Sequence, residues 1–392
     1  MSHANEPDEA TRALRRRVRR GALLLVIAGA LVQIALSAYY LGVGHAPAPH
    51  NLPVGFVASS DTSTQVKELI DKSHAFAGRQ YEDDASMTDA IKHKVIYGGV
   101  DVFDVQHPHL FVASASGPAA SNAIKAAFLA VVQQSIANQV QQLVATGEPI
   151  PPLTLQQLTT PPEITDVVPL PKDDPSGSSI GFLVQALALG ATVASIGLGR
   201  IGQGTRRSIR RGIAHVLTLV VYGGVSAAAV LWAATWFDVI PSAAAGRLFL
   251  DFLLLSVAIT ASTAGAVALI GPAGALLGTL YFTLGLIISG SSILPEFLPT
   301  WGRIVGQSLP TGAGVTAIRE GLYVPDASRT GPLTVMSIYA GVGLAIVLVT
   351  NLIANSRGKT SVLAEIDATD DAEEEDGDEW RPSPGITPDP AP

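Results

Sequence analysis

Long apolar stretches separated by polar segments dominate the pattern of this chain. Several of them approach 20 residues, the length at which a helix crosses about 30 Å of hydrocarbon. Buried core helices of soluble proteins show shorter apolar runs, so the pattern predicts a polytopic α-helical membrane protein with six transmembrane helices. The predicted spans are residues 21–43, 179–199, 213–236, 248–270, 273–290 and 333–354.

The close spacing of two predicted spans leaves one alternative open. Residues 248–270 and 273–290 are joined only by Gly271 and Pro272, so they can also form a tight hairpin of two shorter helices. The five spans within residues 179–354 would make up the transmembrane domain in either case.

Residues 44–178 contain no spanning stretch and predict a folded extracytoplasmic domain between the first two helices. Short apolar runs there alternate with helical spacing, which is typical of a small α/β or α+β layer. The expected strands are residues 52–58, 79–82, 96–103, 109–113 and 163–170. The expected helices are residues 62–77, 86–94 and 119–146.

Composition and charge support this class and orient the chain. Only 15% of residues are charged, against about 25% in soluble domains. Basic residues gather in the N-terminal segment 1–20, in the loop 200–212 and just after the last span. Since cytoplasmic loops are enriched in Lys and Arg, both termini are predicted in the cytoplasm and residues 44–178 outside the plasma membrane.

The C-terminal segment 355–392 is predicted to be an acidic, disordered cytoplasmic tail. Residues 360–392 hold eleven acidic residues and one basic residue, Arg381, together with five prolines. Such a segment has too few apolar groups to offset the entropy that ordering removes.

Several classes of chemistry find no support in the sequence. The external domain has fourteen acidic and seven basic residues, which argues against a nucleic-acid partner, and the chain has no cysteine. His107 and His109 supply two possible metal ligands, but spacing identifies no third. No catalytic motif such as GxSxG or HExxH occurs. We therefore expect neither an enzyme nor a bound cofactor or metal.

Polar and small residues within the spans have simple interpretations. Gln33 and Gln185 are expected to form interhelical hydrogen bonds, and Asp251 is expected near a span end, within reach of water. Gly274 and Gly278 form a GxxxG pair, a pattern that allows close helix contact. This contact would lie either within one subunit or in a homodimer.

The segment 290–332 is too polar to span a membrane but carries regularly spaced apolar residues, so it predicts two short amphipathic helices. These helices would lie in the outer interface or dip into it as a re-entrant, candidate outer gate; an interfacial anchor is the alternative. The candidate gate residues are Pro295, Glu296, Pro299, Trp301, Arg303, Pro310, Arg319 and Glu320.

The order of one anchor helix, one external domain and five clustered helices resembles the ABC-2-type exporter permeases, and most of all their YhgE/Pip-like branch. Residues 52–57 (LPVGFV) are similar to the family's first strand after the anchor. Residues 298–301 (LPTW), 309–310 (LP) and 317–323 (AIREGLY) are similar to its external re-entrant helices. The resemblance implies a permease subunit that exports a lipid-like or amphipathic substrate with a separate ATPase.

One loop departs from the family's pattern. In typical permeases the loop after the second span has an acidic residue and a short helix that contacts the ATPase. Here this candidate coupling loop is wholly basic, so contact with anionic membrane lipids explains it as well. Its arginines are Arg200, Arg206, Arg207, Arg210 and Arg211. The alternative function is a non-transporting cell-surface receptor or secretion accessory protein acting through residues 44–178.

Overall fold

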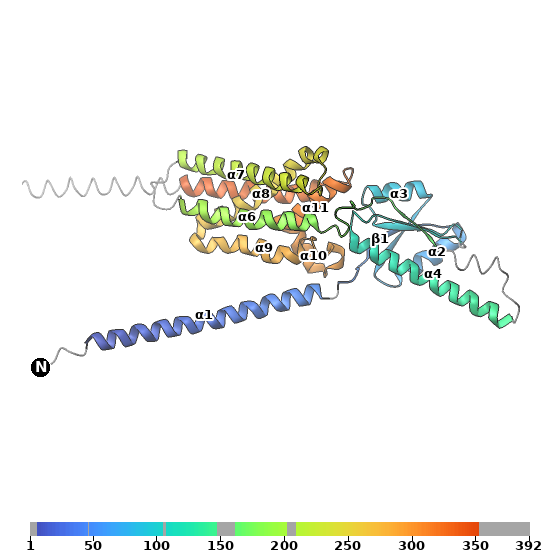
Figure 1. Ribbon diagram of the computed structural model, residues 1–392, viewed down its shortest axis with the longest axis horizontal. Helices are drawn as coiled ribbons and strands as arrows, with labels where there is room; N and C mark the ends of the chain where they lie inside the picture. Colours follow the sequence, from blue (N-terminus) through green and yellow to red (C-terminus); the bar gives the residue numbers. More distant parts are fainter. Residues whose placement is uncertain (1–5, 46, 105–106, 147–160, 202–208, 353–392) are drawn as a thin grey trace, which may run out of the picture.

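The computed structural model describes residues 6–45, 47–104, 107–146, 161–201 and 209–352. These residues form a bundle of long apolar helices with a small α/β domain at one end (Figure 1). The predicted tail 355–392 and the loop residues Arg206 and Arg207 lie outside the described residues. The described architecture is mostly helical and fits the predicted class of polytopic membrane protein.

Among the described residues, five helical segments are long and apolar enough to cross a membrane. They are Ala22–Gly44, Ser179–Leu198, Ile209–Trp236, Ser242–Ile288 and Thr330–Leu352. They belong to helices α1 (Glu6–Gly44), α6 (Ser179–Ile201), α7 (Ile209–Trp236), α8 (Ser242–Ile270), α9 (Leu276–Ile288) and the C-terminal helix.

The fourth segment contains both α8 and α9. Its 47 residues would make a straight helix of about 70 Å, more than twice the hydrocarbon thickness. Instead the chain reverses at the short helix η1 (Gly271–Ala275), where Gly274 packs against the backbone of Ala266. The Tyr281 hydroxyl of α9 donates to Ser262 Oγ of α8 at 3.1 Å. The α8 helix begins at Ser242, directly after Pro241, rather than at the predicted residue 248.

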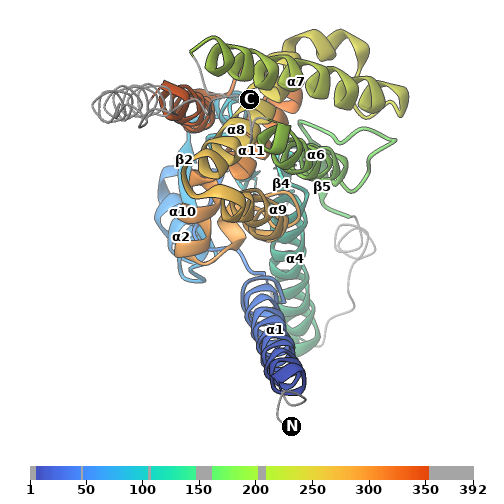
Figure 2. The same cartoon turned by 90° about the vertical axis from the view of Figure 1, so that its left-hand side faces the viewer.

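Helix α1 stands apart from the other long helices over most of its length (Figures 1 and 2). It meets the bundle at its C-terminal end, where the Tyr39 hydroxyl donates to the Leu284 carbonyl at 2.9 Å and Val43 packs against Ile288. Apolar residues such as Leu24 and Leu31 are exposed along the rest of α1. Such a surface requires lipid or another helix to cover it.

The α/β domain is built on a five-stranded sheet of order β2-β1-β3-β4-β5. Strands β3 and β4 are antiparallel, and the other neighbours are parallel. The strands are β1 (Leu52–Val57), β2 (Phe76–Tyr81), β3 (Gly98–Asp101), β4 (His109–Val112) and β5 (Glu163–Asp166). The helices are α2 (Ser60–Asp71), α3 (Asp84–Lys92) and α4 (Pro118–Thr146). The sheet confirms the predicted α/β layer.

Successive side chains of a strand point to opposite faces of the sheet, and in this domain both faces are apolar. Leu52 and Val54 of β1 belong to a cluster with Ile124 of α4, whereas Val57 belongs to a second cluster with Met87 of α3. The helix predicted at 62–77 was too long. It ends at Asp71, His74 then adopts a positive φ of 54°, and β2 begins at Phe76.

Candidate functional site at the junction of domain and helices

The chain between α9 and the C-terminal helix turns back into the bundle, and residues 290–323 are here called the re-entrant segment. After α9, Gly290 adopts a φ of +86°, a conformation that favours glycine, and the chain turns into the short helix η2 (Pro295–Phe297). Helix α10 (Thr300–Ser308) follows, and α11 (Pro310–Tyr323) then enters the bundle. Eleven of the fourteen residues of α11 are buried, and it packs against α6, α8 and α9. Helix α11 therefore lies inside the bundle, and the position of the segment relative to a membrane, interfacial or re-entrant, stays a prediction.

The structure separates the eight predicted gate residues into three groups. Glu296, Arg319 and Glu320 lie at the junction between the bundle and the α/β domain. Trp301 and Arg303 lie on the exposed side of α10. Pro295 and Pro310 are the first residues of η2 and α11, where a fixed φ and a missing N–H are tolerated. Pro299 directly precedes α10.

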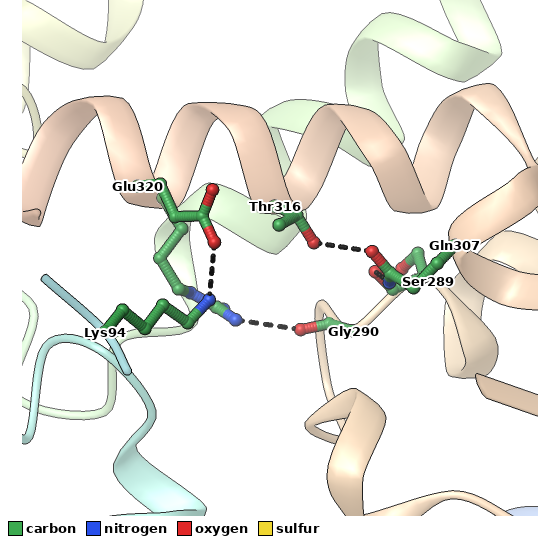
Figure 3. Close-up of polar contacts among 7 residues, drawn as sticks. Lys94, Ser289, Gly290, Gln307, Thr316 and Glu320 are labelled. Carbon is green, nitrogen blue, oxygen red and sulfur yellow. Dashed lines mark hydrogen bonds and ion pairs between the residues drawn. The ribbon is translucent and has the colours of Figure 1, made fainter. Parts of the chain in front are cut away.

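An ion pair joins the domain to α11. Lys94 Nζ, in the turn after α3, lies 2.9 Å from Glu320 Oε1, and their side chains are only 14% and 10% exposed. Figure 3 shows the two side chains pointing toward each other across the junction. Oε2 of Glu320 is buried with no hydrogen-bond partner among the described residues. Glu320 therefore depends on Lys94 for its charge compensation.

A second set of contacts ties α9, α10 and α11 together (Figure 3). The Thr316 hydroxyl donates to Gln307 Oε1 at 2.8 Å, and Gln307 Nε2 donates to the Ser289 carbonyl at 3.3 Å. Gly306 of α10 lies directly against the Ile288 carbonyl, leaving no room for a Cβ. The re-entrant helices are therefore closely fitted to the end of α9.

The domain and the re-entrant segment also share an apolar core. Leu294 directly precedes η2, and Phe297 is the last residue of η2. Both are buried in the same cluster as Leu52 of β1 and Leu110 of β4. Burial and the neighbouring Glu296 carboxylate raise the pKa of Tyr97 in this cluster well above its ordinary value. Tyr97 thus keeps its proton at neutral pH and can donate to Glu296.

Arg319 is the most deeply buried cation described at the junction. It is 5% exposed, and its Nη1 donates to the Gly290 carbonyl at 3.0 Å. Within the part of the chain that the structure describes, no carboxylate lies within 4.0 Å of its guanidinium. Asp174 is also near but accepts from the backbone N–H groups of Ser178 and Ser179, at 3.2 Å each. Asp174 therefore caps the start of α6.

A cavity of about 280 Å³ lies beside Arg319, where α6, the end of α9 and the start of α4 meet. Gln185 lines it, and both amide atoms of Gln185 are buried without a hydrogen-bond partner among the described residues. The predicted interhelical hydrogen bond of Gln185 is therefore wrong. Gln33 lies on an exposed side of α1, which stands away from the other helices, so the same prediction fails there.

Other predicted residues lie away from the junction. Arg210 and Arg211 are exposed in the first turn of α7, and Arg200 lies in the last turn of α6. Asp251 was expected within reach of water, but it is buried and accepts from Arg329 Nη1 at 2.6 Å, because the segment before the C-terminal helix folds over it.

The two histidines flagged as possible metal ligands contact protein groups. His107 Nδ1 lies 2.9 Å from Asp104, and His109 Nε2 lies 2.8 Å from the Thr165 hydroxyl. No group of three or more potential metal-ligating side chains occurs in the described ranges.

Comparison with protein-family models, curated proteins and solved structures gives no match for this chain. The resemblance to ABC-2-type permeases therefore rests on the order of the segments and on the residues quoted above.

Sequence reasoning found the α11 side of the junction and missed the domain side. Lys94, Tyr97 and Asp174 stand in no motif, and each reaches the junction through the tertiary fold. The one local signal was Gln185, a polar residue within a predicted span. An amide side chain is costly in such a span unless a protein partner or a ligand forms hydrogen bonds with it.

Proposed function

We propose that this protein is the membrane permease subunit of an ABC-2-type exporter that moves a lipid-like or amphipathic substrate outward with a separate ATPase. In this proposal α8 and α9 cross the membrane as a pair, which gives six crossings. The termini lie in the cytoplasm and the α/β domain lies outside the plasma membrane.

The observation that carries the proposal is the position of α11. This helix is buried among apolar helices, yet it brings Thr316, Arg319 and Glu320 to the end of the bundle that meets the α/β domain. Polar and charged groups at such a depth are costly and mark sites where polar substrate groups pass. Helices α10 and α11 would form the outer gate, opening when they move away from α9.

The contacts of the α/β domain support a regulatory part in this gate. The Lys94–Glu320 pair and the shared core around Phe297 link the sheet to both ends of the re-entrant segment. Movement of α11 would therefore change how the domain sits on the bundle. A domain that served only as a tethered receptor would need no such link.

The basic end of the bundle is the proposed contact with the ATPase. Arg210 and Arg211 are exposed in the first turn of α7. Helix α7 begins at the end of the bundle away from the α/β domain (Figure 1). An acidic surface on the ATPase would pair with them. Contact with anionic lipid is the other use of these arginines.

Purification of the full chain from its native membrane tests the proposal. A nucleotide-binding subunit should co-purify, and vesicles containing the complex should show ATP-stimulated lipid transport. The double variant Arg210→Ala/Arg211→Ala should reduce recovery of this subunit. The control Arg16→Ala/Arg17→Ala, which removes two exposed arginines from α1, should not. Recovery without any nucleotide-binding subunit, together with no ATP-stimulated transport, would refute the proposal.

One observation favours the alternative function of a receptor or secretion accessory. Helix α4 has 29 residues and projects beyond the sheet (Figure 1). Its distal part exposes apolar residues such as Val131 and Val144. A protein ligand bound along this helix, with function surviving substitutions in α11, would support that alternative.

A further inference from the structure

The cavity beside Arg319 has the size of a head-group site. Its volume of about 280 Å³ lies just below the range of roughly 300–1,000 Å³ found for small-molecule sites. It therefore has room for a small polar group and not for a whole lipid. Its polar lining residues include Ser178, Ser291, Ser292, Gln185 and Arg319.

The charged residues that line the cavity indicate which ligand charge it would favour. Among the described residues that line the cavity, Arg319 is the ionisable one. The neighbouring carboxylates make their direct contacts with other groups: Asp174 caps α6, Glu296 faces Tyr97, and Glu320 pairs with Lys94. Asp174 and Glu296 interact with the Arg319 guanidinium only at longer range. The guanidinium, 5% exposed, has one backbone acceptor and no carboxylate within 4.0 Å in the described structure. An anion in the cavity would give the guanidinium the direct ionic partner that it lacks.

Gln185 gives a second, independent sign of a ligand. Its Nε2 and Oε1 are both buried without a protein partner. A buried polar atom left without a hydrogen bond is costly, so an amide in this state needs a bound group to satisfy it. The side chain lies on α6 two turns into the helix, on the same cavity as Arg319 of α11.

The apolar surroundings show how the rest of the ligand would lie. Phe182 and Leu286 also line the cavity, and they are 71% and 40% exposed. They belong to α6 and α9, two helices that are apolar enough to sit in a membrane. An acyl chain leaving the cavity would therefore pass along these side chains into the bilayer.

We propose that this cavity binds the anionic head group of a membrane amphiphile, with Arg319 pairing the anion and Gln185 hydrogen-bonding to it. This inference rests on the proposed function, since it names the substrate class of the same permease. It specifies a phosphate or carboxylate head group with at least one apolar chain.

Photolabelling of the full-length protein in a neutral detergent tests the site. The probe is a photoreactive phosphatidylglycerol, compared with the matched phosphatidylcholine. We expect phosphatidylglycerol to label α6 near Phe182 and the end of α9. Gln185→Leu and Arg319→Gln should each lower this labelling at least tenfold. Arg247→Gln, which removes an exposed cation near the start of α8 outside the cavity, should leave it unchanged.

A second readout separates binding from folding. Gln185→Leu replaces two unpaired polar atoms with apolar ones, so the unliganded variant should melt at or above the wild-type temperature while losing the label. Equal labelling by phosphatidylcholine, labelling unchanged in both cavity variants, or equal competition by inorganic phosphate would each overturn the proposal. Labelling as expected without ATP-stimulated transport would refute the proposed function and leave this site standing.

Discussion

Replacing Lys94 with Met removes the positive charge that faces Glu320 across the junction and keeps most of the length of the side chain. The two groups are 2.9 Å apart, and their side chains are 14% and 10% exposed. Oε2 of Glu320 is buried without a partner in the described structure. The Lys94→Met variant therefore leaves a carboxylate uncompensated inside the junction.

The magnitude follows from this burial. Removing one partner of a buried ion pair costs about 3–5 kcal/mol. Because neither side chain is wholly buried, we expect the lower end of this range, about 3 kcal/mol, for Lys94→Met. Glu320→Gln should cost less, since the flexible lysine can turn its ammonium group toward water. The double variant Lys94→Met/Glu320→Gln should recover most of the loss, because neither charge remains.

Thermal unfolding of the three variants in one detergent measures this coupling as a double-mutant cycle. Lys94→Met should melt lowest, Glu320→Gln higher, and the double variant close to wild type. Lys92→Met, which removes an exposed cation from α3, should be neutral. Additive losses in the double variant, or no loss in Lys94→Met, would refute the reasoning.

Three further predictions use the same melting assay. Gly306→Ala should cost about 1–3 kcal/mol by overpacking against the Ile288 carbonyl, whereas Gly246→Ala, with nothing within 4 Å, should be neutral or stabilising; equal effects would contradict this packing. Phe297→Ala should cost about 3–5 kcal/mol by emptying the shared core; no loss would show that the core is not shared. Arg329→Met should destabilise more than Asp251→Asn, because it alone leaves a buried carboxylate unpaired.

The sequence was sufficient for elements whose pattern is local. The apolar stretches predicted the long helices, and the alternation of strands and helices predicted the α/β layer. The errors fall at the ends of elements: α2 ends at Asp71, shortly before the positive φ of His74, and α8 begins at Ser242, directly after Pro241. Such conformations depend on tertiary contacts that periodicity does not contain.

The candidate site was only half predictable for a similar reason. Arg319 and Glu320 were predicted because they belong to segment 290–332, which is too polar to span a membrane but has amphipathic helical spacing. Lys94, however, lies 226 residues from Glu320 along the chain, and nothing near it marks it as a partner. Gln185 was noticed but given an interhelical hydrogen bond, because the sequence does not reveal which amides face a cavity.

Reversible locking of the re-entrant helix offers the most direct test of the central claim, that α11 is the outer gate of a transport path. The chain has no cysteine, so an introduced pair can be oxidised without competing thiols. A Cβ built on Gly285 of α9 would lie 3.2 Å from Thr311 Cβ of α11, slightly closer than the usual disulfide separation of about 3.5–4.5 Å. The variant Gly285→Cys/Thr311→Cys should therefore form a disulfide between the two helices.

The measurement is ATP-stimulated movement of a fluorescent phosphatidylglycerol in vesicles containing this variant and the native ATPase. We predict transport in the reduced protein, none after oxidation, and recovery when reductant is added, while oxidant leaves the cysteine-free wild type unaffected. Equal transport by the oxidised and reduced protein, or no ATP-stimulated transport by the wild type, would contradict the account.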